Sequence, residues 1–266
     1  MPKQPIAIPY GLRETLQRGL THYKIIFLSA GTGWGKSTAV TKLLEKQNAA
    51  HLSLRKKTLP SYFPKERIIL LDDFQELPPQ AEQQFQEILR KSQRGQHFIL
   101  ISRGPMPAYL SLYEATGSLL QLGSDDLALD IECLTQLAMA RQLSLSSEEI
   151  QRLRDETGGC PAAVNILLRA LAAGQPFQKP AIDAMRWKMG AYIDETALRL
   201  LEPKAKKLLT ELSLFEEFDQ ELAEMLTGDK AVFSTLESLR STSGLIQRQG
   251  AAVSPSVPRW GSPSSK

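Results

Sequence analysis

A glycine-rich segment between an apolar run and a helical pattern constrains the fold of this chain most. Residues 30–37 read AGTGWGKS, which fits the phosphate-loop pattern GxxxxGK[ST] with alanine in the first position. The apolar run 24–29 before it predicts a buried strand, and residues 36–47 after it predict a helix. A strand, a glycine-rich loop and a helix in this order are typical of an α/β protein that binds phosphate groups.

The residue types of this loop suit the phosphate chain of a nucleotide. Its glycines let backbone N–H groups approach phosphate oxygens without interference from a Cβ atom. We expect Lys36 to reach the β- and γ-phosphates, Ser37 to ligate Mg²⁺ and Thr38 to bond the α-phosphate. Trp34 has no phosphate role in the pattern and is expected to pack on the base or on a lid. The residues expected to bind the cofactor here are Gly31, Thr32, Gly33, Trp34, Gly35, Lys36, Ser37 and Thr38.

Two adjacent carboxylates follow a second apolar run. Residues 68–71 predict a buried strand, and Asp72 and Asp73 come directly after it. Because the carboxyl ends of parallel strands meet at one edge of a sheet, we expect Asp72 beside the phosphate loop, where it would hold Mg²⁺ with Ser37. Because Asp73 is the next residue, its side chain is expected to point in a different direction from that of Asp72. Asp73 is therefore the candidate general base for an attacking water.

A third apolar run, residues 97–102, ends in Arg103. A guanidinium at the same edge can sense the γ-phosphate or stabilise charge in its transfer, so Arg103 is the second candidate catalytic residue. Position alone also allows a surface arginine that merely follows a strand. The basic run at residues 55–57 is interpreted as a solvated loop, and the three histidines as structural residues.

The predicted secondary structure changes near residue 123. Before it, residues 119–122 and, more weakly, 51–54 predict further strands, and residues 79–92 predict a helix between strands. This alternation is typical of a parallel α/β sheet. After it strand signals stop and helical patterns follow, of which residues 146–156 and 162–173 are the clearest.

Composition excludes several classes of protein. Among 266 residues, 42% are hydrophobic and 23% are charged, as in an ordinary globular chain, and the net charge of +3 does not argue for nucleic acid. No apolar run approaches the roughly 20 residues that span a bilayer, so we expect no membrane partner. Two cysteines and three histidines offer neither a disulfide framework nor a metal-ligand cluster, and we expect a cytoplasmic protein.

Together these motifs resemble the STAND-type signal-transduction ATPases, especially the nucleotide-binding module of large LuxR-type (MalT-like) transcription regulators. The resemblance covers roughly residues 5–250 and implies a P-loop NTPase sheet of order 5-1-4-3-2, a helical lid and a partial winged-helix domain. It also implies that Arg103 is a sensor arginine and that Pro161 borders the nucleotide. The segments that carry it are residues 30–37, 70–74 (LLDDF), 101–107 (ISRGPMP) and 157–163 (TGGCPAA).

Two departures from the family pattern affect these expectations. Only residues 55–66 separate the weak second strand from the next, at the lower limit for a parallel crossover, so this edge of the sheet is expected to be reduced or differently paired. No histidine follows His97, so the nucleotide-sensing histidine of the family has no counterpart, and the sensor repeats and the helix-turn-helix are not found in this sequence. We therefore expect no sequence-specific DNA binding by this chain alone.

The resulting hypothesis is a switch module that binds ATP or ADP with Mg²⁺, hydrolyses ATP slowly and self-associates in the ATP form. A P-loop kinase or other phosphoryl-transfer enzyme, and a degenerate nucleotide-binding interaction protein, are the alternatives. The expected domains are a nucleotide-binding domain at 1–124, a helical lid at 125–175, a partial winged-helix domain at 176–250 and a disordered tail at 251–266.

Overall fold

The computed structural model describes most of the chain and divides it into two compact units. The first, which we call the sheet unit, consists of Tyr10–Ala30 and Gly35–Leu127. The second, the helical unit, consists of the residues before Tyr10, the short stretch Gly31–Trp34 and the residues from Ala128 onward. The described residues are 5–56, 58–60, 63–199, 201–212, 219–228, 232, 235–236, 246–249 and 252–255.

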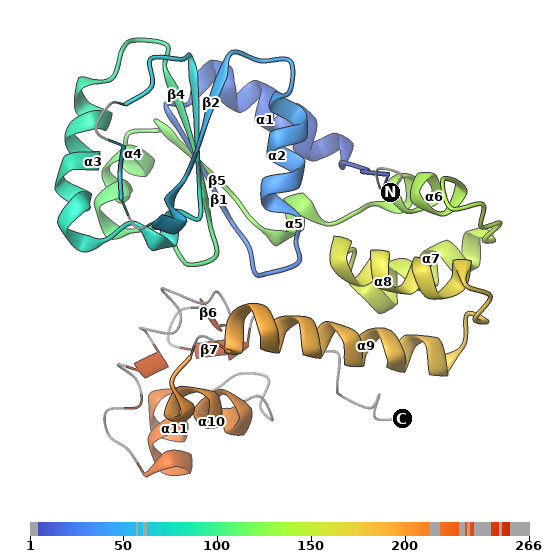
Figure 1. Ribbon diagram of the computed structural model, residues 1–266. Helices are drawn as coiled ribbons and strands as arrows, with labels where there is room; N and C mark the ends of the chain where they lie inside the picture. Colours follow the sequence, from blue (N-terminus) through green and yellow to red (C-terminus); the bar gives the residue numbers. More distant parts are fainter. Residues whose placement is uncertain are drawn as a thin grey trace. The chain divides into compact units, whose positions relative to one another are not determined.

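Five parallel strands form the centre of the sheet unit (Figure 1). Their order is β2-β3-β4-β1-β5, which confirms the predicted order 5-1-4-3-2 and the predicted α/β class. The three central strands are buried except for the last residue of β1 and of β3, as expected for parallel strands covered on both faces. The strands are β1 (Ile25–Ser29), β2 (Ala49–Ser53), β3 (Ile68–Asp72), β4 (His97–Ser102) and β5 (Leu119–Leu122).

Helices cover both faces of this sheet, with α1 and α2 on one side and α3 and α4 on the other (Figure 1). On α3, Phe85 packs edge-on against Phe74 and Phe98, and these rings belong to a core of buried side chains from the strands, α3 and the 3₁₀ turns. The elements of the sheet unit outside the strands are α1 (Tyr10–His22), α2 (Lys36–Leu44), α3 (Pro79–Lys91), α4 (Ser111–Ala115), α5 (Ser124–Leu127) and the 3₁₀ turns η1 (Leu54–Lys56), η2 (Phe74–Glu76) and η3 (Ala108–Leu110).

The expectation of a reduced or differently paired sheet edge is wrong. β2 pairs with β3 in parallel along its whole length, from Ala49 opposite Ile68 to Ser53 opposite Asp72. The crossover begins with the tight turn η1, and Leu54 at its start is 1% exposed within the core of the sheet unit. A buried anchor directly after β2 lets a short connection return to the sheet.

The helical unit is built from helices that pack around two apolar cores, a larger one under α6 to α9 and a smaller one between α10 and α11. The most buried members of the larger core include Leu134, Leu153 and Leu167, one from each of three successive helices. The helices are α6 (Ile131–Met139), α7 (Ser147–Thr157), α8 (Pro161–Ala172), α9 (Lys179–Ile193) with the π-helical turn η4 (Asp194–Leu198), α10 (Pro203–Leu212) and α11 (Gln220–Thr227). In the described part of the chain, no helix is long and apolar enough to cross a membrane.

Two short strands correct the expectation that strands end near residue 123. β6 (Ile246–Gln249) and β7 (Ala252–Pro255) pair as an antiparallel hairpin, and β7 lies inside the predicted disordered tail. Neither segment has an apolar alternation in its sequence (IQRQ and AVSP), so the pattern gave no strand signal. The rest of the predicted tail, and much of the predicted winged-helix region, lies outside the described residues.

The first turn of α7 provides a test of the helical unit. Ser146 accepts a bond from the Glu149 N–H at 3.2 Å, and the Glu149 carboxylate accepts one from the Ser146 N–H at 2.8 Å. We expect Ser146→Ala to remove about 1 kcal/mol of stability, because this capping box satisfies two exposed helix donors. Chemical denaturation measures the loss. Ser147→Ala, one residue further along, is the matched control, and an equal effect of both changes would contradict the capping role.

Candidate phosphate-binding site

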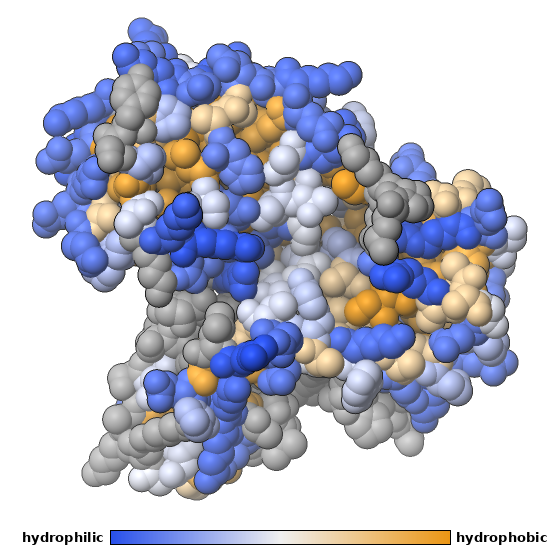
Figure 2. All heavy atoms as spheres, in the orientation of Figure 1, coloured by the Kyte–Doolittle hydropathy of each residue, from blue (hydrophilic) through white to orange (hydrophobic). Residues whose placement is uncertain are grey.

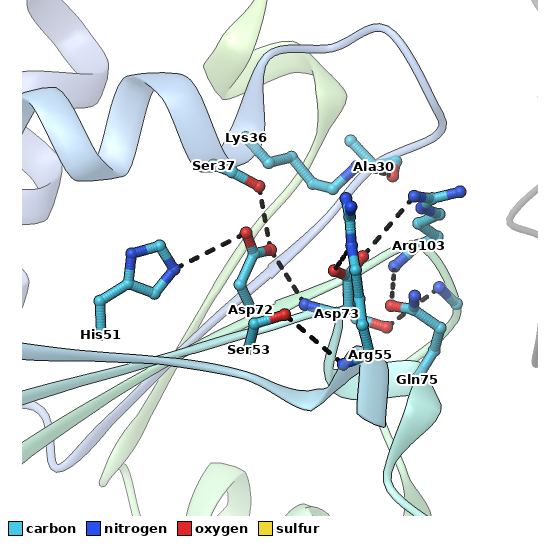
Figure 3. A network of polar contacts seen from close by, with 12 residues as sticks. Ala30, Lys36, Ser37, His51, Ser53, Arg55, Asp72, Asp73, Gln75 and Arg103 are labelled. Carbon is cyan, nitrogen blue, oxygen red and sulfur yellow. Dashed lines mark hydrogen bonds and ion pairs between the residues drawn. The ribbon is translucent and has the colours of Figure 1, made fainter. Parts of the chain in front are cut away.

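The carboxyl ends of the strands bring the predicted polar residues of the sheet unit to one edge (Figure 3). β3 ends in Asp72, and Asp73 begins the turn η2; Arg103 follows β4 directly. Lys36 and Ser37 open α2, and Ala30 follows β1. Four elements therefore deliver their terminal side chains to one place, as the strand-end argument predicted.

The Ser37 hydroxyl and the Asp72 carboxylate lie side by side. Ser37 Oγ donates to Asp72 Oδ1 at 2.9 Å, and the same oxygen accepts the Asp73 N–H at 2.9 Å. A hydroxyl and a carboxylate are the oxygen ligands that Mg²⁺ prefers, and Mg²⁺ is usually held by one or two such groups together with phosphate oxygens. No group of three or more His, Cys, Asp or Glu side chains suited to a metal occurs among the described residues.

Lys36 is buried at the start of α2, with 8% of its surface exposed. Its ammonium group donates to the carbonyl of Ala30 at 2.6 Å, so it points back toward the beginning of the loop. Gly35 before it has φ +72°, a left-handed conformation that strains any residue with a Cβ atom. The Lys36 ammonium group thus lies close to the backbone of the loop, which the phosphate-loop pattern predicts to bind a phosphate chain.

The middle of the loop packs within the helical unit. The carbonyl of Gly33 accepts the Ala162 N–H at 3.1 Å and lies 3.6 Å from Cys160 Sγ, so it meets the first turn of α8, where Pro161 stands. Trp34 is half-buried against the core of the same unit, and its contact with the base of a nucleotide stays a prediction. The contact of Pro161 with a nucleotide stays a prediction.

Two threonines of the loop differ in environment. Thr32 Oγ1 is buried and, among the described residues, has no hydrogen-bond partner. A buried hydroxyl without a partner is costly, and a ligand oxygen at the loop would satisfy it. Thr38 is exposed on α2, where it is accessible to a ligand. The residues present therefore fit a phosphate-bearing cofactor.

Asp73 is held between two arginines. Its carboxylate is 9% exposed, accepts Arg55 Nε at 2.7 Å on Oδ2 and faces Arg103 at 3.6 Å from Oδ1 (Figure 3). Its backbone is left-handed, with φ 57° and ψ 43°, which is uncommon for a residue other than glycine. The Asp73 carboxylate thus meets two arginines, whereas the Asp72 carboxylate meets Ser37. The role of Asp73 as a base stays a prediction.

Arg103 is positioned by its own backbone. Its N–H donates to Gln75 Oε1 at 3.0 Å, which links the end of β4 to the turn η2. The adjacent Ser102 hydroxyl accepts the Gly104 N–H at 3.0 Å, and Ser29 donates to the Gly104 carbonyl at 2.7 Å. The segment after β4 is therefore fixed on both sides, and the Arg103 guanidinium starts from a defined point.

Three residues of this edge were missed by the sequence analysis. Arg55, interpreted as part of a solvated loop, instead bonds Asp73, and this hydrogen bond raises the pKa of the Arg55 guanidinium. His51, interpreted as structural, has Nε2 3.8 Å from Asp72 Oδ2. Arg55 lies beside Asp73 because β2 and β3 pair in register up to their ends; the strand-end rule applied to the weak second strand would have found it. Gln75 had no sequence signal.

The fold resembles those of solved structures. The Walker-type ATPase PABY2304 of Pyrococcus abyssi is similar over 96% of this chain and 94% of that chain, with a TM-score of 0.68 and 13% identity. A RuvB variant of Thermotoga maritima is similar over 95% of both chains, with a TM-score of 0.51 and 13% identity. Likeness at this identity shows the fold alone, and the fold resembles that of P-loop NTPases.

Other comparisons do not narrow the class further. A STAND protein with a tetratricopeptide repeat sensor from Pyrococcus horikoshii covers 95% of this chain and 42% of that chain at 16% identity, but its TM-score of 0.46 supports no conclusion. No protein family matches the sequence, and no curated protein matches it either.

Proposed function

We propose that this chain binds ATP and ADP with Mg²⁺ and acts as a slow ATPase switch. The observation that carries the proposal is the 2.9 Å bond between Ser37 and Asp72, beside a buried lysine and at the start of a phosphate loop. These are the two oxygen ligands and the cation that phosphoryl-transfer sites of this fold require. The solved structures with this fold, one of which is a Walker-type ATPase, support the proposal.

In this proposal each residue has a separate task. Lys36 and the N–H groups of the loop bind the phosphate chain, and Ser37 and Asp72 hold Mg²⁺. The metal, when bound, neutralises charge on the β- and γ-phosphates. Asp73 accepts a proton from the attacking water, and Arg103 stabilises the charge of the transferred phosphoryl group.

The regulatory part of the proposal rests on the sequence resemblance to LuxR-type (MalT-like) regulators. We propose that the ATP form self-associates and that the chain alone does not read DNA sequence. The helical unit exposes the apolar side chains of Ile131 and Met139 on α6, and Figure 2 shows apolar residues gathered over α6 to α8. Exposed apolar residues that gather on one face are typical of association surfaces. Sedimentation with ATP and with ADP tests this, and equal mass in both would contradict it.

Turnover without an acceptor separates the switch ATPase from a phosphoryl-transfer enzyme. We expect the purified chain to release phosphate from Mg-ATP slowly with no second substrate present, because the proposal makes Asp73 the base that activates water. Chelation of Mg²⁺ and the Lys36→Ala variant are the controls for contaminating activity. Phosphate release that appears only after an acceptor is added would favour the kinase, and nucleotide binding without any turnover would favour a degenerate interaction protein.

A further inference from the structure

Arg55 makes the shorter of the two arginine contacts to the proposed base, and it does so from the turn η1, which directly follows the edge strand β2. Its Nε donates to Asp73 Oδ2 at 2.7 Å, whereas Arg103 stands 3.6 Å from the other oxygen. The Arg55 side chain is 74% exposed, while the carboxylate that it binds is 9% exposed. The exposed side chain of Arg55 therefore donates a hydrogen bond to a buried carboxylate.

The backbone that carries Arg55 is fixed even though its side chain is exposed. Leu54 before it is buried in the core of the sheet unit, and Ser53 pairs with Asp72 at the end of β2. Figure 3 shows Arg55 and Arg103 reaching Asp73 from different elements. The guanidinium of Arg55 thus starts from a fixed point but has space to change partner by rotation of its side chain alone.

Several cations gather at this edge of the sheet. Lys36, Arg55 and Arg103 stand at the same strand ends as the carboxylates of Asp72 and Asp73. If Asp73 meets the water that attacks the γ-phosphate, that phosphate lies within one water of the group that Arg55 now binds. Phosphate oxygens compete well for an arginine, because its planar fork matches them as it matches a carboxylate.

We infer that Arg55 distinguishes ATP from ADP: it holds Asp73 when no γ-phosphate is bound and transfers its hydrogen bond to the γ-phosphate when ATP binds. This inference rests on the proposed function, since it needs Asp73 beside the γ-phosphate. ADP offers no such acceptor, so Arg55 remains on Asp73. The transfer also frees Oδ2 of Asp73 at the moment when the base is needed.

Separate titrations with ATP and ADP in Arg55→Ala test the inference. We expect affinity for Mg-ATP to fall about tenfold and affinity for Mg-ADP to stay within about twofold, because only the γ-phosphate loses a charge-assisted contact. Lys56→Ala is the matched control: it removes the same charge from the neighbouring exposed position of the turn η1, and we expect both affinities to stay within about twofold.

A second variant tests the transfer of the bond itself. Asp73→Asn replaces the charged acceptor of the Arg55 hydrogen bond with a neutral one, so Arg55 is released more easily. We therefore expect Asp73→Asn alone to bind ATP more tightly than the parent, and the double variant Asp73→Asn, Arg55→Ala to show no such gain over Arg55→Ala. Arg55→Lys keeps the charge but loses the fork, and we expect an ATP affinity between those of the parent and Arg55→Ala. Circular dichroism of each variant confirms that it is folded.

The outcomes separate this inference from the proposed function. A parent chain that binds neither nucleotide contradicts both. A parent that binds both nucleotides, with Arg55→Ala losing ATP and ADP equally or losing neither, contradicts the inference alone. A gain in ATP affinity from Asp73→Asn that persists without Arg55 shows that simple charge removal, rather than transfer of the bond, is responsible, and it overturns the transfer.

Discussion

Asp73→Asn is expected to bind ATP as tightly as the parent or more tightly, and to hydrolyse it at least about 100-fold more slowly. General base catalysis contributes about 10²- to 10⁴-fold, and an amide cannot accept the proton from water. Binding survives because the base acts only in the chemical step. Single-turnover hydrolysis and calorimetry on the same preparation measure the two effects.

Asparagine is a suitable replacement at this position. The Asp73 backbone has φ 57°, and asparagine adopts this left-handed conformation more readily than most residues, so the turn η2 is retained. The matched control is Asp72→Asn, which we expect to weaken Mg²⁺-dependent ATP binding as well as turnover. Equal loss of binding in both variants would show that the two carboxylates do not have separate roles, and full hydrolysis in Asp73→Asn would assign the base elsewhere.

The central part of the sheet was predictable from local pattern. The runs that form β1, β3 and β4 are apolar because both faces of these strands are covered, and each was predicted to within one residue at either end. Their carboxyl ends carry the loop, Asp72 and Arg103, so the shared edge followed from the strand-end rule alone. The strand order did not follow from any single run; it came from the resemblance to a known family.

The parts that escaped prediction depend on tertiary pairing. β2 is an edge strand with exposed positions, so its apolar pattern is weak. The proximity of Arg55 to Asp73 could not be predicted without knowing the register between β2 and β3. Arg55 therefore looked like one member of a basic run. The hairpin of β6 and β7 has backbone pairing without apolar alternation, and composition alone assigned its second strand to a tail. In both cases long-range contacts outweigh local preference.

Lys36→Ala is expected to weaken Mg-ATP binding by about 10- to 150-fold. A hydrogen bond to a charged group contributes about 1.5–3 kcal/mol, and alanine removes the only part of this side chain that can reach a phosphate. Alanine also favours the helix that begins here, so α2 is retained. Lys42→Ala on the same helix is the control, because Lys42 is exposed and paired with Glu45, and such surface pairs contribute little.

Calorimetric titration of Mg-ATP into the parent chain and into Lys36→Ala tests the central claim most directly. The account predicts one saturable site in the parent, an affinity at least about tenfold weaker in Lys36→Ala and an unchanged affinity in Lys42→Ala. A parent chain that binds no nucleotide, or a Lys36→Ala variant that binds Mg-ATP as tightly as the parent, would contradict the assignment of residues 30–37 as a nucleotide-binding phosphate loop.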